Sequence, residues 1–165
     1  MALRQIREQE DEILRKKSRD VNVDDILLPK NQNLIDDMLE TMYEFKGVGL
    51  AAVQVGILKK IIVIDVEDGH GPYILINPNL LKTKGEKECE EGCLSFPNEF
   101  GKVIRPTEVI VEFYDRKAKK IKLKAKDLLA QAICHEIDHL NGIVFKDLVL
   151  PGTLEYISPE KEEKK

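Results

Sequence analysis

Residues 127–142 read DLLAQAICHEIDHLNG and predict one helix with a buried face. Apolar residues recur in this stretch at the three- and four-residue spacing of a helix that packs against a core. Asp127 is expected to cap the first turn, and Gly142 stands where a helix commonly turns left-handed and ends. The stretches on either side have the composition of short strands, so we expect a sheet to enclose this helix.

Several runs outside this helix are rich in β-branched residues or alternate apolar with polar residues, as strands do. They cover residues 59–66 (KKIIVIDV), 73–76 (YILI), 108–114 (EVIVEFY) and 121–124 (IKLK), with a hairpin turn at 115–119 and a further short strand at 144–149. A second amphipathic helix is expected over residues 31–46, ended by Gly47. Strands and helices do not alternate regularly. We therefore predict an α+β fold in which a mixed or antiparallel sheet is wrapped around the central helix.

The chain has the size and composition of a single domain. It contains 165 residues, of which 42% are hydrophobic, 5% are aromatic and none is tryptophan. Ile, Val and Leu must therefore fill most of the core. We place one catalytic domain at residues 1–150 and a short charged tail at residues 151–165, which ends in EKEEKK.

Charge and hydropathy exclude several classes of partner. Charged residues make up 34% of the chain with both signs interleaved, and the net charge is only -4, so we expect no DNA binding. No stretch approaches the roughly 20 apolar residues of a membrane span, and the first residues are charged rather than forming a secretion signal. We therefore expect a cytoplasmic protein without membrane contact, whose three cysteines are reduced.

His135, Glu136 and His139 form an HExxH pattern inside the predicted central helix. Residues four apart share a helix face, so both imidazoles can bind one metal ion. Glu136 is rotated by about 100° around the helix axis and can address a water on that ion. A catalytic site of this kind needs a third protein ligand from elsewhere in the chain.

The sequence offers different candidates for the third ligand. A metzincin would place a third histidine shortly after Gly142, and this chain does not. A downstream carboxylate, Asp147 or Glu155, would make a zinc endopeptidase, but neither stands on a second long helix. Cys93, in the run EGCLS, would complete a compact site suited to zinc or ferrous iron, although a lone cysteine is more often a packed thiol. The residues alone leave the carboxylate and Cys93 open.

Three runs together resemble the peptide deformylase family. They are GVGLAAVQ at 47–54, EGCLS at 91–95 and QAICHEIDH at 131–139, and their order and separations match those of the family. The flanking runs ILRKKSRDV and INPNL agree, so the resemblance covers about residues 13–148. The chain departs from the family at Val53, where many members carry proline, and matches it less closely between Pro97 and Arg105. The first departure removes no catalytic atom, and the second implies that the rim of the peptide cleft differs in its preference.

The resemblance implies that Cys93, His135 and His139 bind one divalent metal ion. It implies Fe2+ as the native ion, although Zn2+, Ni2+ or Co2+ can occupy a site of one thiolate and two imidazoles. On this basis Cys93 is a ligand and not a nucleophile.

The resemblance also implies a hydrolase that removes the formyl group from the initiator methionine of newly made polypeptides. Glu136 would take a proton from the attacking water and give it to the leaving amine. The side-chain amide of Gln54 and the backbone N–H of Leu94 would stabilise the oxyanion that forms on the formyl group. The implied partners are N-formylmethionyl nascent peptides and, transiently, the ribosome.

Four further residues are implied to bind the substrate. Val48, Leu128 and Ala132 would line the pocket for the methionine side chain. Gly49 lets another backbone approach closely, so an extended peptide can pair along this segment.

Other functions agree with parts of the sequence. A zinc endopeptidase would keep the helix but take a downstream carboxylate, and a binding module would use the metal for structure alone. A cysteine hydrolase would use Cys93 as its nucleophile. Asp138, one turn from His135, is expected to orient a ligand histidine or to form an ion pair. The lysines of the EKEEKK tail are offset by glutamates, so this tail offers no basic anchor for RNA.

Overall fold

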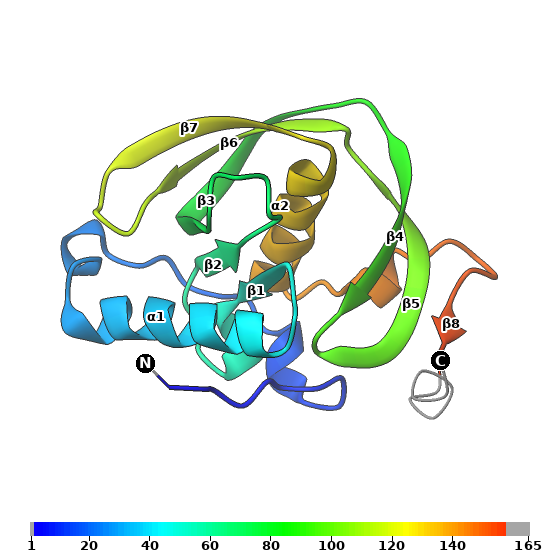
Figure 1. The fold of residues 1–165 in the computed structure, drawn as a ribbon, viewed down its shortest axis with the longest axis horizontal. Helices are drawn as coiled ribbons and strands as arrows, with labels where there is room; N and C mark the ends of the chain where they lie inside the picture. The colour runs from blue at the N-terminus through cyan, green and yellow to red at the C-terminus, as the bar shows by residue number, and fades with distance from the viewer. Residues whose placement is uncertain (1, 158–165) are drawn as a thin grey trace.

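Figure 1 shows the fold in a computed structural model, which describes residues 2–157. The helices in this range are α1 (Pro29–Glu44) and α2 (Asp127–Leu140). The strands are β1 (Gly49–Ala51), β2 (Ile61–Ile64), β3 (Tyr73–Lys84), β4 (Lys87–Cys93), β5 (Phe96–Arg105), β6 (Glu108–Tyr114), β7 (Lys120–Lys126) and β8 (Glu155–Tyr156). Short 3-10 turns occur at η1 (Glu12–Arg15), η2 (Val23–Asp25), η3 (Ala52–Val55) and η4 (Phe145–Asp147).

The strands form two antiparallel sheets. The larger sheet has the order β1-β2-β3-β6-β7, and the smaller has the order β4-β5-β8. In Figure 1 the larger sheet bends over α2, while the β4–β5 hairpin stands beside the helix. Every pairing between these strands is antiparallel. The α+β prediction, with a sheet wrapped around the HExxH helix, is confirmed.

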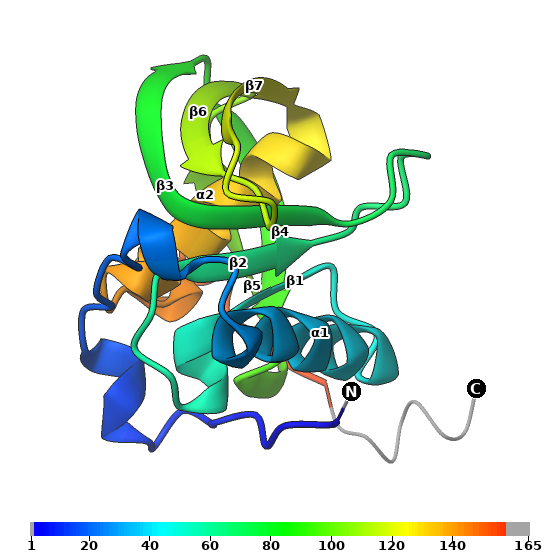
Figure 2. The same cartoon turned by 90° about the vertical axis from the view of Figure 1, so that its left-hand side faces the viewer.

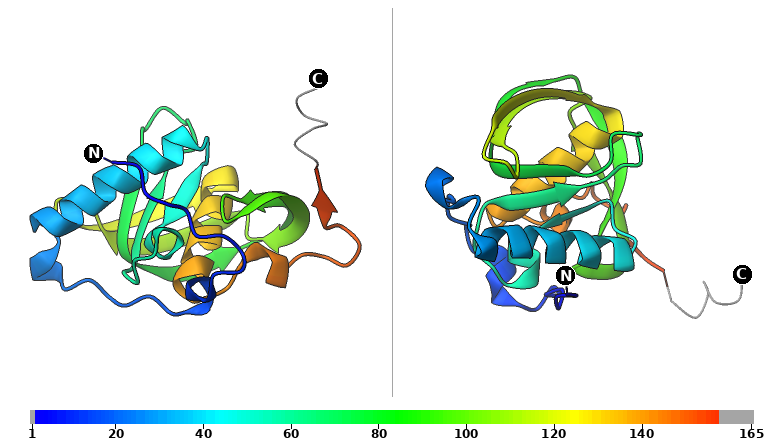
Figure 3. Two further views of the ribbon diagram at one scale, coloured as in Figure 1. Left: turned by 90° about the horizontal axis from the view of Figure 1, so that it is seen from below. Right: turned by 60° about the vertical axis from the view of Figure 1, so that its left-hand side comes forward.

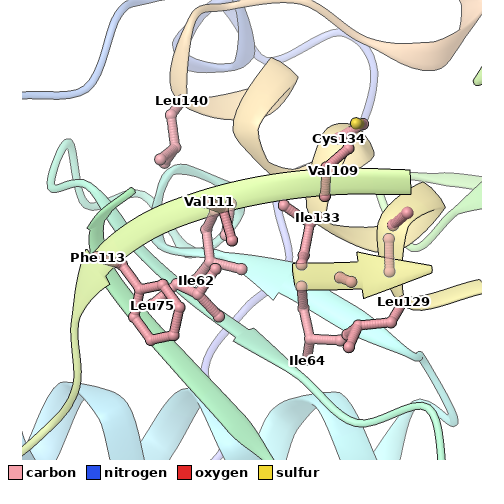
Figure 4. Packing of buried hydrophobic residues seen from close by; sticks show 14 of the residues in the cluster. Ile62, Ile64, Leu75, Val109, Val111, Phe113, Leu129, Ile133, Cys134 and Leu140 are labelled. Carbon is pink, nitrogen blue, oxygen red and sulfur yellow. The ribbon is translucent and has the colours of Figure 1, made fainter. Parts of the chain in front are cut away.

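One face of the larger sheet packs against α2, as Figure 4 shows. The labelled side chains of this core are Ile62, Ile64 and Leu75 from β2 and β3, Val109, Val111 and Phe113 from β6, and Leu129, Ile133, Cys134 and Leu140 from α2 and its end. Successive strand residues point to opposite faces, so Ile61, Val63, Ile74 and Ile76 join a second core with α1. The first core fixes α2, and with it the HExxH residues.

A bulge lets β3 take part in both halves of the larger sheet (Figure 2). Its pairing with β6 shifts register between Ile76 and Asn79. Asn77 adopts a φ of 53°, a left-handed conformation that asparagine tolerates. Its amide is held by Val21, whose N–H donates to Oδ1 at 2.8 Å and whose carbonyl accepts from Nδ2 at 2.8 Å. Beyond this bend, β3 pairs with β6 above α2.

The N-terminal segment crosses α1 and runs on toward η1, as the left view of Figure 3 shows. Arg4 pairs with Asp37 of α1 at 2.9 Å. The backbone N–H of Arg7 donates to the carbonyl of Gln54 at 2.7 Å. These contacts tie the segment to η3, which carries Gln54.

Most of the local predictions are confirmed, since both helices, the four strand-like runs outside 144–149 and the hairpin turn are present. Two are wrong. Asp127 does not cap α2: Lys126 is the N-cap residue, and Asp127 is the first helical residue, with a φ of 52°. Residues 144–149 are not a strand, because the Asp147 carboxylate accepts the Val144 N–H at 3.1 Å and closes the turn η4.

The predicted tail is described only in part. Its residues 151–157 include β8, which pairs with β5 through Glu99 with Tyr156 and Phe100 with Glu155. The EKEEKK run lies outside the described residues. Within residues 2–157, neither helix has the length and apolar character needed to cross a membrane.

Candidate metal centre

Cys93, the last residue of β4, lies next to the two histidines of α2. The Sγ atom of Cys93 and one ring nitrogen from each of His135 and His139 all lie within 4.8 Å of one another. Cys93 Sγ is 3.2 Å from His139 Nε2. Both histidines are buried. The structure therefore brings together the three side chains that the resemblance assigned to the metal.

The end of β4 delivers Cys93 to this position. The pairing of β4 with β5 shifts register between Gly92 and Cys93. A side chain at Gly92 would put its Cβ 2.8 Å from the ring of Phe100, so glycine permits the close approach of the two strands here.

A buried ionic network holds His135 in place. Glu91 Oε1 lies 2.8 Å from His135 Nδ1, which donates to it and leaves Nε2 directed at the centre. Arg105 donates to both carboxylate oxygens of Glu91 at 2.7 and 2.8 Å, and to Asp138 at 2.7 Å. Burial opposes the charge on Glu91, but hydrogen bonds from Arg105 and His135 prevail and lower its pKa to about 2. Glu91 is therefore ionised.

The network corrects one half of the Asp138 hypothesis. Asp138 forms the expected ion pair, with Arg105 as its partner. The residue that orients a histidine is Glu91, which is not in the HExxH run. The sequence did not predict this role for Glu91, although Glu91 begins the EGCLS motif. No pattern in the sequence indicated a role for Arg105.

Glu136 is buried at the floor of the site, and its Oε2 lies 3.9 Å from His135 Nε2. Its other oxygen, Oε1, has no hydrogen-bond partner among the described residues. A Cβ at Gly49 would lie 2.7 Å from Oε2, so glycine is needed there to admit the carboxylate. Burial raises the pKa of Glu136 to about 7, although the charge of His135 lowers it. The position suits a group that both takes and gives a proton.

Gln54 is buried and reaches the centre from η3. Its Oε1 accepts the N–H of Ala51 at 2.9 Å, which fixes the direction of the amide. Its Nε2 donates to Ser95 Oγ at 3.1 Å and lies 3.4 Å from Cys93 Sγ. A surface role for this amide is excluded, because Gln54 is 1% exposed.

The site opens into a cleft of about 1000 Å³. Its lining includes all four residues implied to bind substrate, Val48, Gly49, Leu128 and Ala132, together with Cys93, Leu94, His135 and Glu136. The backbone of Leu94 follows Cys93 directly, and a Cβ at Gly47 would meet the Leu94 side chain at 2.6 Å. The structure thus gathers, at one cleft or directly beneath it, the residues that the resemblance assigned to the metal, to catalysis and to the substrate.

The donor set fits a metal ion. One sulfur and two imidazole nitrogens converge, as in catalytic sites that keep a position for water. Burial lowers the pKa of His139 well below its usual value, so this ring is neutral, the state in which imidazole binds metals. The alternative carboxylates are elsewhere: Asp147 pairs with Arg15, and Glu155 is exposed on β8.

Comparison with known proteins identifies the family. The family model described as Polypeptide deformylase matches residues 3–153. The chain belongs to this family. Peptide deformylase 1 of Clostridium acetobutylicum is 55% identical over 148 residues, which are 89% of this chain and 95% of the relative. The peptide deformylase of Lachnoclostridium phytofermentans is 49% identical over 164 residues, 99% of each chain.

A solved deformylase has the same fold. The crystal structure of peptide deformylase from Thermotoga maritima aligns with a TM-score of 0.84 at 36% identity, covering 92% of this chain and 100% of that one. The protein is therefore a metal-dependent hydrolase that removes the N-formyl group from the initiator methionine of newly made polypeptides. The family therefore replaces the two alternative interpretations of the site, a zinc endopeptidase and a non-catalytic binding module.

Proposed function

We propose that Cys93, His135 and His139 bind one divalent metal ion and that the native ion is Fe2+. The observation that carries this proposal is the convergence of one sulfur and two imidazole nitrogens within 4.8 Å beside the buried Glu136. A thiolate with two imidazoles suits Fe2+ as well as Zn2+, Ni2+ and Co2+. The resemblance to iron-dependent family members favours Fe2+ among them.

Glu136 acts as the general acid and base. A divalent ion, when bound, supplies the Lewis acidity that lowers the pKa of water and polarises the formyl carbonyl. Glu136 takes the proton of the attacking water and returns it to the amine that leaves. The unpartnered Oε1 of this buried carboxylate supports the role, since within residues 2–157 no side chain competes for it.

Gln54 and Leu94 stabilise negative charge on the formyl oxygen. The Ala51 N–H fixes the Gln54 amide beside Cys93. One N–H of its Nε2 donates to Ser95 Oγ, and the other, directed at Cys93 Sγ, turns to donate to the oxyanion. The backbone N–H of Leu94 follows the metal ligand Cys93 and is the second donor.

The methionine side chain lies in the part of the cleft formed by Val48, Leu128 and Ala132. All three are apolar and line the same cleft as Cys93 and Glu136. β1 is the end strand of the larger sheet, so a substrate backbone can add to it at Gly49. The proposed sites of action are the cytoplasm and the ribosome, from which the formylated nascent peptides emerge.

Deformylation of formyl-Met-Ala-Ser tests these roles. Anaerobically purified, Fe2+-loaded protein should turn over this peptide, and Glu136→Ala should lower kcat by about 10²–10⁴-fold. The control is the metal content, which should stay at one ion per chain in both proteins. Undiminished turnover by Glu136→Ala would overturn its assignment, and a Zn2+-loaded enzyme as fast as the Fe2+-loaded one would overturn the choice of ion.

A further inference from the structure

Lysines gather on the outer face of the larger sheet, opposite the face that packs on α2. β7 reads KIKLKAK, and its alternate residues point to opposite faces. Ile121, Leu123 and Ala125 belong to the core with α2. The four lysines of β7 therefore point outward, where they are exposed.

The same face continues across β6 to β3. Residues opposite one another in antiparallel strands share a face. Glu108 of β6 is opposite Lys126 of β7 and also opposite Lys84 of β3. Ile110 is likewise opposite Lys124 and Lys82. The lysine face, as we call it, thus consists of Lys82, Lys84, Lys120, Lys122, Lys124 and Lys126.

The lysine face is positive although the chain as a whole has a net charge of -4. The carboxylates that β6 adds to it are Glu108 and Glu112, which pair with Lys124 and Lys120. Within the described residues, Lys82, Lys84 and Lys122 form no ion pair. A hydrogen bond from Lys124, together with the charges of Lys126 and Lys84, lowers the pKa of Glu108, as expected where positive charge accumulates.

The geometry of the face suits a row of phosphates. Side chains two apart on a strand are roughly 7 Å apart, so the β7 lysines extend over roughly 20 Å. A nucleic-acid strand carries one phosphate per about 3.4 Å, so roughly six phosphates match that length. Figure 1 shows the sheet arched over α2 with its outer side convex. The lysines of β7 alternate with the core residues that face α2, so they lie on this outer side.

Protection of a sheet edge is a second role that lysines at these positions can serve. Lysines on an exposed edge strand prevent pairing with other chains, and β7 is such a strand. Lys82 and Lys84 also lie at an open edge, because β2 pairs with β3 only at residues 73–76 and this later part of β3 pairs with β6 alone. Edge protection predicts no affinity for phosphate, so the binding experiment below separates it from docking.

We propose that the lysine face docks the protein on the ribosome by binding the phosphate backbone of ribosomal RNA. The proposal rests on the proposed ribosome contact and assigns the surface that makes it. Lysine binds phosphate as a point charge without reading the base sequence, so contact with the backbone is sufficient. The cleft does not include any of these lysines, so a docked enzyme keeps its active site open.

Co-sedimentation with salt-washed bacterial ribosomes tests the proposal. The variant is Lys82→Gln, Lys84→Gln and Lys122→Gln together, which removes three unpaired charges without breaking an ion pair. The control is Lys16→Gln, Lys17→Gln and Lys30→Gln, which removes the same charge from exposed residues off the sheet. We expect the lysine-face variant to bind ribosomes at least about tenfold more weakly than the wild type at about 50 mM salt. The slope of log affinity against log salt concentration should fall in magnitude by about 2–3. The control should bind like the wild type.

Turnover of formyl-Met-Ala-Ser by each preparation separates this proposal from the proposed function. Both variants should keep wild-type kcat/KM, because a tripeptide needs no docking. Equal ribosome binding by the two variants would overturn the lysine face while leaving the deformylase assignment intact. Tighter binding to phosphatidylglycerol vesicles than to ribosomes would also overturn it and would point to a membrane surface instead.

Discussion

Charged residues have different roles in two regions of the molecule: the buried network of Arg105, Glu91 and Asp138 beside the metal centre, and the lysine face. The side chains of Arg105 and Glu91 are 5% and 4% exposed, and two hydrogen bonds of 2.7 and 2.8 Å join them. On the lysine face, Lys120, Lys124 and Lys126 are 59%, 60% and 67% exposed; Lys120 pairs with Glu112, and the other two share Glu108. A buried charge must be paired and therefore positions its neighbours, whereas exposed charges contribute a field that salt screens.

The largest effect should come from breaking the buried network. Arg105→Met removes the two hydrogen bonds from the guanidinium to Glu91 and the ion-pair partner of Asp138, so the buried Glu91 carboxylate loses its compensating positive charge. We expect the free energy of unfolding to fall by about 3–5 kcal/mol. Urea unfolding of metal-free protein measures this without a contribution from metal binding.

Arg116→Met is the matched control for that comparison. Arg116 also pairs with a carboxylate, Asp36, but the two side chains are 33% and 34% exposed. Its loss should cost about 0–1 kcal/mol. If the two methionine variants were destabilised equally, burial would not be what separates the two regions.

A smaller effect is expected from weakening the contact between the network and His135. Glu91→Gln keeps the size of the side chain but removes the charge that accepts from His135 Nδ1. Metal affinity should fall by about 10–100-fold, as for other residues that orient a ligand histidine. Competition with a chelator measures it, with Glu88→Gln as the control because Glu88 is exposed on the same strand. Equal affinity in both variants would show that Glu91 does not tune the histidine.

The sequence predicted the parts of the molecule that depend on local pattern. The helical spacing of α2 and the alternation in β6 and β7 were visible, and the HExxH spacing placed both histidines. β4 and β5 were missed because KECEEGC and FPNEFGKVIR lack a clear alternation and contain glycine or proline. Their strand conformation comes from pairing with each other, a tertiary effect that local propensity does not carry.

Long-range contacts account for the functional features that were missed. Arg105 is distant in sequence from Asp138, and its register partner in β4 is Lys87, so its contacts with Glu91 and Asp138 depend on how the β4–β5 hairpin lies against α2. The lysine face depends on the bulged register between β3 and β6, which aligns Lys82 with Ile110 and Lys84 with Glu108. A net charge near zero concealed this face, because charge balance does not record on which side of a sheet each residue lies.

The smallest effect should come from removing one exposed partner. Lys124→Gln should raise the pKa of Glu108 toward the ordinary glutamate range, because the hydrogen bond from Lys124 is the largest cause of its lowering. A carboxyl whose pKa is lowered by folding stabilises the fold above its unfolded pKa, and this contribution is lost as the pH falls through the lowered value. With Glu108 exposed to solvent, the thermal unfolding midpoint at neutral pH should nevertheless stay within measurement error. An NMR pH titration at low and high salt measures the pKa in both proteins. If high salt left the wild-type pKa unchanged, the charges on this face would not act as a screened field, and the contrast with the buried network would fail.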